Sequence, residues 1–179
     1  MVSRPAVYNI TMTGDANDQV LNLTAVELYR TQGNLRAVVD FLAASMSQLP
    51  IKVYTRKGEN ERVRDRSGKA AKLLWRPNNY QTQLEFIRGL MAEYYVFGAV
   101  YVWVVPSTES PSNWDLHLIP TNWVIGSKEK TPYTPGTIRV CSKTGTDAVD
   151  IPDTEFLQFK TYSPGHPGDY LSPISSLRQ

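Results

Sequence analysis

Hydrophobic residues in the first half of the chain recur with a helical period. Across LRAVVDFLAASMSQL (35–49), apolar and polar positions alternate every three or four residues, which predicts an amphipathic helix that follows an Asn34 cap and ends before Pro50. A shorter helical segment, TAVELYR, precedes it from Thr24. The residues expected to face the core from the longer helix are Leu35, Val38, Val39, Leu42 and Met46.

The clearest helix start lies at Thr82, after the turn RPNN (76–79). Thr82 and Glu85 have the T-x-x-E spacing of a capping box, in which each side chain accepts a hydrogen bond from the backbone amide of the other residue. Gly98 is expected to end this helix as a left-handed cap. The predicted core face is Leu84, Ile87, Met91, Tyr94 and Tyr95, widened by Phe86 and Leu90, and the predicted solvent face is Glu85, Arg88 and Glu93.

The second half of the chain has the alternation and the turn residues of β-strands. The strand candidates AVYVWVV (99–105), WDLHLIP, NWVIG, TIRVC and EFLQFK are separated by Pro, Gly, Ser and Asn turns. Helices come first along the chain and strands later. The sequence therefore predicts an α+β fold in which helices pack on a mainly antiparallel sheet.

Length and composition fit one folded domain. The chain has 179 residues, of which 41% are hydrophobic and 20% charged, as is usual for a globular protein. Residues 1–23 show no sustained period and are expected to form a flexible N-terminal arm ahead of a domain at 24–179. The start lacks the apolar core of a signal peptide, and the nearly apolar run 94–106 is too short for a membrane-spanning helix, which indicates the cytoplasm.

Positive charge is concentrated in one segment. The net charge of +2 is too small for a strongly electrostatic nucleic-acid binder, but residues 52–76 hold nine Lys or Arg against three acidic residues. A strand, IKVYT (51–55), is predicted to begin there, with Gly58 and Gly68 as turn formers. Two interpretations stay open: a solvated hairpin or loop, which is the usual role of a charge run, and a nucleic-acid-binding module.

The aromatic residues around Gly98 also have two interpretations. On a solvent-facing strand they would form a platform for stacking nucleic-acid bases, and inside a corner between helix and strand they would be core. The positions fall on the faces that the two periods assign to the core, which favours the second interpretation. The residues are Tyr94, Tyr95, Phe97, Tyr101 and Trp103.

Few residues suited to catalysis or metal binding converge. His117 and Asp115 share one face of a predicted strand, and a hydrolase or nuclease would use them with Asp169. His166 beside Asp169 supplies too few ligands for zinc, and Cys141 lacks a neighbouring cation that would favour its thiolate. The phosphate-binding spacings G-x-x-x-x-G-K-[ST] and G-x-G-x-x-G are absent. We predict no catalytic residue, no cofactor, no metal and no enzyme activity.

Several segments together resemble the portal proteins of tailed bacteriophages, the head-to-tail connectors, of the siphophage type. A helix that ends in an SLP-like turn, here ASMSQLPIKVYTR, is followed by a charged loop and then by RPNNYQTQLEFIRGLMAEYYVFGAVYVWVV. The family pattern there is a Pro-Asn turn, a Thr-capped helix that contains a Phe, and a Gly before an aromatic strand. The matching residues are Pro77, Asn78, Thr82, Phe86, Gly98 and Tyr101.

Two downstream segments extend the resemblance to roughly residues 24–179. LIPTNWV is similar to the family's short apolar-Pro segment before a Val strand. IPDTEFLQFKTYSPGHPGDYLSPISSLR is similar to its acidic-aromatic strand, Gly-rich loop and helix start, although Ile174 stands where Leu is usual and makes this last motif looser.

The resemblance implies a structural subunit of a ring, twelve-fold in the particle, at one capsid vertex. Double-stranded DNA would pass through the ring without sequence-specific binding. The terminase large subunit, head-tail adaptor proteins, and capsid and scaffold proteins would be partners, and ATP hydrolysis would belong to the motor. The subunit would assemble in the host cytoplasm and remain in the virion. Residues 24–179 resemble the outer α+β wing, with the stem, clip and crown expected beyond Gln179.

Overall fold

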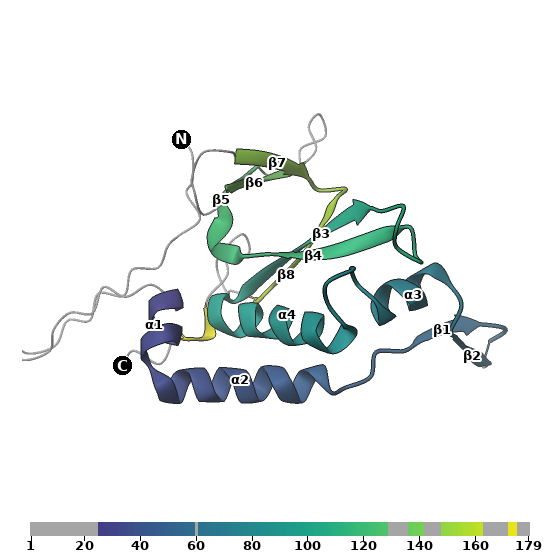
Figure 1. The fold of residues 1–179 in the computed structure, drawn as a ribbon, viewed down its shortest axis with the longest axis horizontal. Helices are drawn as coiled ribbons and strands as arrows, with labels where there is room; N and C mark the ends of the chain where they lie inside the picture. Colours follow the sequence, from purple (N-terminus) through teal and green to yellow (C-terminus); the bar gives the residue numbers. More distant parts are fainter. Residues whose placement is uncertain (1–24, 60, 129–135, 142–147, 163–171, 175–179) are drawn as a thin grey trace, which may run out of the picture.

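The computed structural model describes residues 25–59, 61–128, 136–141, 148–162 and 172–174. Within these residues the chain forms three layers: a layer of helices, a three-stranded sheet in the middle, and a second three-stranded sheet on the far side (Figure 1). Every described strand pair is antiparallel. The predicted α+β fold, with helices packed on a mainly antiparallel sheet, is confirmed.

The layers are built from elements that follow one another along the chain. The helices of the first layer are α1 (Ala25–Thr31), α2 (Gly33–Ser47) and α4 (Gln83–Phe97). The middle sheet has the order β4 (Trp114–Ile119), β3 (Ala99–Pro106), β8 (Phe156–Lys160). The outer sheet has the order β5 (Val124–Lys128), β6 (Thr137–Cys141), β7 (Ala148–Pro152), and the short helix η1 (Thr121–Trp123) precedes it. None of the described helices combines the length and the apolar character needed to cross a membrane.

Strand β3 is the centre of the core because both of its faces are covered. On the helix side, Val102 packs in a cluster with Phe86 of α4. On the other side, Ala99 and Tyr101 join a cluster completed by Ile119, Val124, Ile138 and Ile151. Burial on both faces explains why this strand is apolar at successive positions. Tyr101 is 3% exposed, so this residue belongs to the core and not to a base-stacking platform.

Helix α4 begins and ends at the predicted residues. The Glu85 amide donates to Thr82 Oγ1 at 3.3 Å, and the Thr82 amide donates to Glu85 Oε2 at 2.8 Å, which completes the capping box. Gly98 follows the last turn with a φ of 75°, a left-handed conformation that glycine adopts without steric cost. The helix therefore turns directly into β3.

The buried face of α4 differs from the predicted one at two positions. Leu84 was expected in the core and is 49% exposed. Glu93 was expected in solvent, but it is half-buried, and its Oε2 accepts a hydrogen bond from the Thr121 amide at 3.1 Å. The reason is that α4 is covered on two sides, because Phe86 packs into the middle sheet and Val96 packs toward α2. A single helical period cannot represent two buried faces.

Helix α2 begins without the predicted Asn34 cap. Its first residue is Gly33, and Gln32 is the N-cap residue, with no hydrogen bond from its side chain. The cap is unnecessary because α1 runs almost directly into α2: the Gln32 amide donates to the Leu28 carbonyl, and the Arg36 amide donates to the Gln32 carbonyl. Asn34 therefore lies inside the first turn, and this prediction was wrong.

The buried face of α2 is also rotated from the predicted one. Its buried residues are Val39, Ala43 and Ser47, which include two small side chains. Small residues let α2 approach α4 closely. As a result, the predicted core residues Val38, Leu42 and Met46 are exposed by 56%, 38% and 39%, and Phe41 by 70%.

The turn at Pro77 and Asn78 closes the outer edge of β4. The Leu116 amide donates to the Pro77 carbonyl at 2.7 Å, and Asn78 Nδ2 donates to the Leu116 carbonyl at 2.8 Å. Asn78 Oδ1 accepts from the amides of Tyr80 and Gln81 at 2.9 and 2.8 Å. The buried Asn78 side chain thus replaces a neighbouring strand at this point of the edge.

The basic segment forms a hairpin and a short helix. The hairpin consists of β1 (Val53–Arg56) and β2 (Arg62–Asp65), and it extends from one end of the molecule in Figure 1. Asp65 Oδ1 accepts from the Ser67 and Gly68 amides, and helix α3 (Lys69–Trp75) follows. The first interpretation of this segment, a solvated hairpin, is therefore the one that its structure matches.

The last described residues return to the helix layer. Ile174 is buried in a cluster with Val39 and Val96, and the Ser172 hydroxyl donates to the Val96 carbonyl. The predicted N-terminal arm and Thr24, where the first helical segment was expected to begin, lie outside the described residues. Of the helix start expected near the end of the chain, the described part is a short 3₁₀ turn at Pro173 and Ile174.

Replacing Thr82 by alanine should lower the free energy of unfolding by about 1 kcal/mol, because the Glu85 amide loses its acceptor. Hydrogen bonds from the Thr82 amide and hydroxyl lower the pKa of the Glu85 carboxyl. A carboxyl with a lowered pKa stabilises the fold above its unfolded pKa, and this contribution is lost as the pH falls through the folded pKa. The cost of Thr82→Ala should therefore shrink in acid. Urea unfolding at neutral pH and at pH values below the folded pKa of Glu85 measures how this cost changes, with Thr82→Ser as control. An alanine variant as stable as the wild type at neutral pH would refute the capping role.

Replacing Glu93 by glutamine should leave the protein at least as stable as the wild type at neutral pH. Burial raises the pKa of the Glu93 carboxyl, against the opposing effect of the hydrogen bonds from Thr121. The folded state then binds the Glu93 proton more tightly than the unfolded state, so stability falls as the pH rises through the unfolded and then the folded pKa. Glutamine keeps an acceptor for the Thr121 amide without the charge.

The matched variant Glu93→Ala leaves the Thr121 amide unpaired and should cost about 1–3 kcal/mol. Thermal unfolding at neutral and acidic pH separates the two effects. A glutamine variant that is less stable than the wild type at neutral pH, and equal to it in acid, would contradict the assigned role of burial.

Candidate interaction surface

The residues predicted to be candidates for chemistry do not form a cluster in the described structure. His117 and Asp115 lie on β4, opposite Trp103 and Val105 of β3. Asp169 and His166 lie outside the described residues, so the hydrolase or nuclease arrangement stays untested. Within the described ranges, no group of three His, Cys, Asp or Glu residues could hold a metal ion. Cys141 is a half-buried free thiol at the end of β6.

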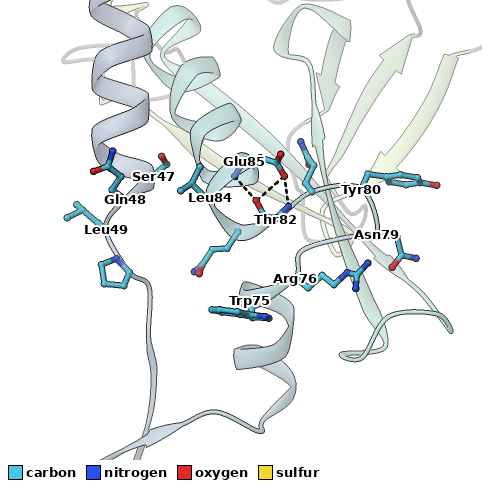
Figure 2. A pocket seen from close by; sticks show the side chains of 13 residues that line it. Ser47, Gln48, Leu49, Trp75, Arg76, Asn79, Tyr80, Thr82, Leu84 and Glu85 are labelled. Atoms are coloured by element: carbon cyan, nitrogen blue, oxygen red, sulfur yellow. Dashed lines mark hydrogen bonds between the residues drawn. The ribbon is translucent and has the colours of Figure 1, made fainter.

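An exposed tryptophan lies between two hollows where α2, α3 and α4 meet. Trp75 is the last residue of α3 and is 76% exposed. A hollow of about 600 Å³ lies between the end of α2, Trp75 and the start of α4, and another of about 490 Å³ lies between Trp75, β1 and β2. Figure 2 shows the side chains of Leu49 and Leu84 facing the Trp75 ring across the first hollow.

We call the exposed apolar and cationic residues that line these two hollows the Trp75 surface. Its apolar members are Leu49, Ile51, Trp75 and Leu84, and its cationic members are Lys52, Arg64, Arg66 and Arg76. Tryptophan and arginine are enriched among the residues that dominate the binding energy of protein interfaces. The composition of this surface is therefore typical of a protein interface.

The charge of the Trp75 surface is unbalanced because its four cations outnumber the two carboxylates that line the hollows, Asp65 and Glu85. Asp65 accepts hydrogen bonds from the amides of Ser67 and Gly68, and Glu85 is held by Thr82 in the capping box. Among the described residues, Arg139 forms an ion pair with Asp150, and the four cations of the Trp75 surface have no acidic partner. The surface therefore presents free positive charge around an apolar centre.

Reasoning from the sequence found part of this surface and missed its centre. The charge run at 52–76 was recognised from its composition, and AAKLLW was expected to be a short helix. The exposure of Trp75 was missed, because it depends on how the end of α3 meets the end of α2 and the start of α4. The available signal was a tryptophan inside a strongly basic segment, a combination more typical of an interface than of a core.

The comparison with known protein families matches nearly the same residues that carry the resemblance described from the sequence. Residues 34–179 match the family model of the phage portal protein. No curated protein matches the chain.

Solved structures with a similar fold come from gene transfer agent particles. A chain in the neck of an empty GTA particle computed with C6 symmetry has a TM-score of 0.68 and 18% identity. A chain in the virion of a native gene transfer agent particle has a TM-score of 0.64 and 19% identity, and a chain in the native neck computed with C12 symmetry has 0.59 and 20%. The similar part covers 85% of this chain but only 41%, 39% and 39% of those chains.

At these identities the neighbours support the fold alone, while the family model extends over most of the domain that the sequence predicts. The Pro-Asn turn, the capping box and the aromatic strand all lie within the matched residues. The chain therefore belongs to the phage portal protein family.

Proposed function

We propose that this chain is part of a structural subunit of a phage portal ring at the capsid vertex. The observation that carries the proposal is the family match over residues 34–179, which coincides with the three-layer fold. The similar chains belong to the necks and the virion of gene transfer agent particles, which supports a place in the virion. Assembly would take place in the host cytoplasm.

The ring would serve as a conduit for double-stranded DNA during packaging and ejection. It would also be the docking platform for the terminase large subunit and then for head-tail adaptor proteins, next to capsid and scaffold proteins. These roles require surfaces that fit partners and no reacting groups. The Trp75 surface supports a role of this kind, because its composition is typical of a protein interface.

The proposed DNA contacts are weak and independent of sequence. A channel in which DNA slides works best without tight phosphate contacts, because each DNA phosphate that a Lys or Arg neutralises raises the affinity of the channel for DNA. In the basic hairpin, acidic residues interrupt the run of cations, and the Arg56 guanidinium donates to the carbonyls of Gly58 and Glu59. These features limit a continuous positive stripe.

We further propose that residues 24–179 form the wing of a longer subunit, with the stem and clip elsewhere. The chain spans about two fifths of the neck and virion chains that it resembles. Residues 1–23 would be an arm in front of the wing. A wing by itself would offer only part of the contact between subunits.

Sedimentation velocity on this 179-residue chain and on the full-length subunit tests the proposal. Association costs several kcal/mol of translational and rotational freedom, which a partial interface does not offset. We expect the short chain to be monomeric or weakly associating and the full-length subunit to form a ring. A full-length subunit that stays monomeric under all conditions would overturn the portal assignment, and a stable ring of the short chain would overturn the wing proposal.

A further inference from the structure

We propose that the Trp75 surface of one copy binds the β8 margin of the next copy, head to tail around the ring. By the β8 margin we mean Glu155, Leu157 and Phe159, on strand β8 and the turn before it. The inference rests on the proposed ring function, and it adds which two surfaces meet. One copy would supply an apolar and basic surface, and its neighbour an apolar and acidic one.

The β8 margin is an incompletely covered part of the core sheet. Leu157 lies opposite Val102 of β3, and Phe159 lies opposite Val100, so both side chains belong to the face of the sheet that packs on the helices. Val100 and Val102 are almost completely buried, whereas Leu157 and Phe159 are 49% and 48% exposed. The helix layer thus covers β3 and leaves the apolar residues of β8 partly in solvent.

The two surfaces lie at opposite edges of the middle sheet. Its order is β4, β3, β8, and the segment that carries Trp75 runs along the outer side of β4, where Pro77 and Asn78 bind Leu116. Strand β8 forms the other edge, and no described strand pairs with its outer side. Two different surfaces on one subunit are what a head-to-tail ring requires.

Charge favours this pairing over the symmetric one. Two Trp75 surfaces facing each other would bring two sets of unpaired cations together, which is repulsive. Glu155 is exposed beside Leu157 and Phe159, so the β8 margin offers a carboxylate next to apolar side chains. The chain outside residues 52–76 carries a net negative charge, so a neighbouring copy is an electrostatically suitable partner.

The apolar residues of the two surfaces are also of suitable size to pack against each other. Trp75 stands between two hollows that are large enough for side chains of the size of Leu and Phe, and a tryptophan that becomes buried at an interface contributes far more binding energy than a residue at the rim. Around this apolar contact, four cations would donate hydrogen bonds to the Glu155 carboxylate of the neighbouring copy. They are Lys52, Arg64, Arg66 and Arg76.

Chemical cross-linking between two single-cysteine variants of the full-length subunit tests the pairing. Both variants carry Cys141→Ser, and any cysteine of the full-length subunit outside this chain is replaced by serine as well, so that no natural thiol reacts. One then carries Arg66→Cys on the Trp75 surface, where three other cations remain, and the other carries Thr154→Cys beside the β8 margin, which keeps the Glu155 carboxylate; both positions are exposed. A short bifunctional maleimide is added to each variant alone and to the assembled mixture.

The proposal predicts cross-linked dimers in the mixture and none above background in either variant alone. Trp75→Ala in the Arg66→Cys variant should reduce the yield about tenfold or more, as expected for the loss of one aromatic anchor. The matched control Trp114→Ala removes another exposed tryptophan, outside both surfaces, and should leave the yield unchanged.

The outcomes separate this inference from the proposed function. Rings that form without cross-links in the mixture overturn the pairing and leave the portal function intact. Cross-links in the Arg66→Cys variant alone also overturn it, because they indicate a symmetric contact. A parent subunit that forms no ring overturns the portal function and the pairing with it.

Discussion

The hydrogen bonds between the Pro77-Asn78 turn and Leu116 hold the parts of this structure together. They join the turn between the end of α3 and the start of α4 to the edge of β4, so the start of α4 is tied directly to the middle sheet. Asn78 suits this place because its side chain donates to the strand carbonyl and accepts from two amides of its own turn. An apolar side chain of similar size would leave these buried backbone groups unpaired.

One consequence is that the two edges of the middle sheet differ. The β4 edge is covered by a polar turn that satisfies its backbone, whereas β8 has no described strand on its outer side. An open strand edge with exposed apolar residues favours association with another chain. In the proposed portal ring, such an edge would direct association to one side of the subunit.

The predictions that succeeded depend on short spacings along the chain. The capping box at Thr82 and Glu85, the left-handed Gly98 and the doubly buried strand β3 follow from neighbouring residues, and the Pro-Asn turn with these features made the portal family recognisable. The face of α2 was wrong because Ala43 and Ser47, which carry little hydrophobic signal, decide how closely it packs. Glu93 was misplaced because its partner Thr121 is 28 residues away. The Trp75 surface was missed for the same reason, since elements that are separated along the chain form it.

Amide hydrogen exchange at Leu116 and Gln158 is the most direct test of the difference between the covered β4 edge and the open β8 edge of the middle sheet. By the alternation of the two antiparallel pairs, both amides point away from β3; the Leu116 amide donates to the Pro77 carbonyl, and the Gln158 amide has no partner among the described residues. We predict that the Leu116 amide is protected in the free chain and in the assembled ring, while the Gln158 amide exchanges rapidly in the free chain and becomes protected on assembly. Rapid exchange at Leu116 in the free chain, or equally rapid exchange at Gln158 in both states, would contradict this account.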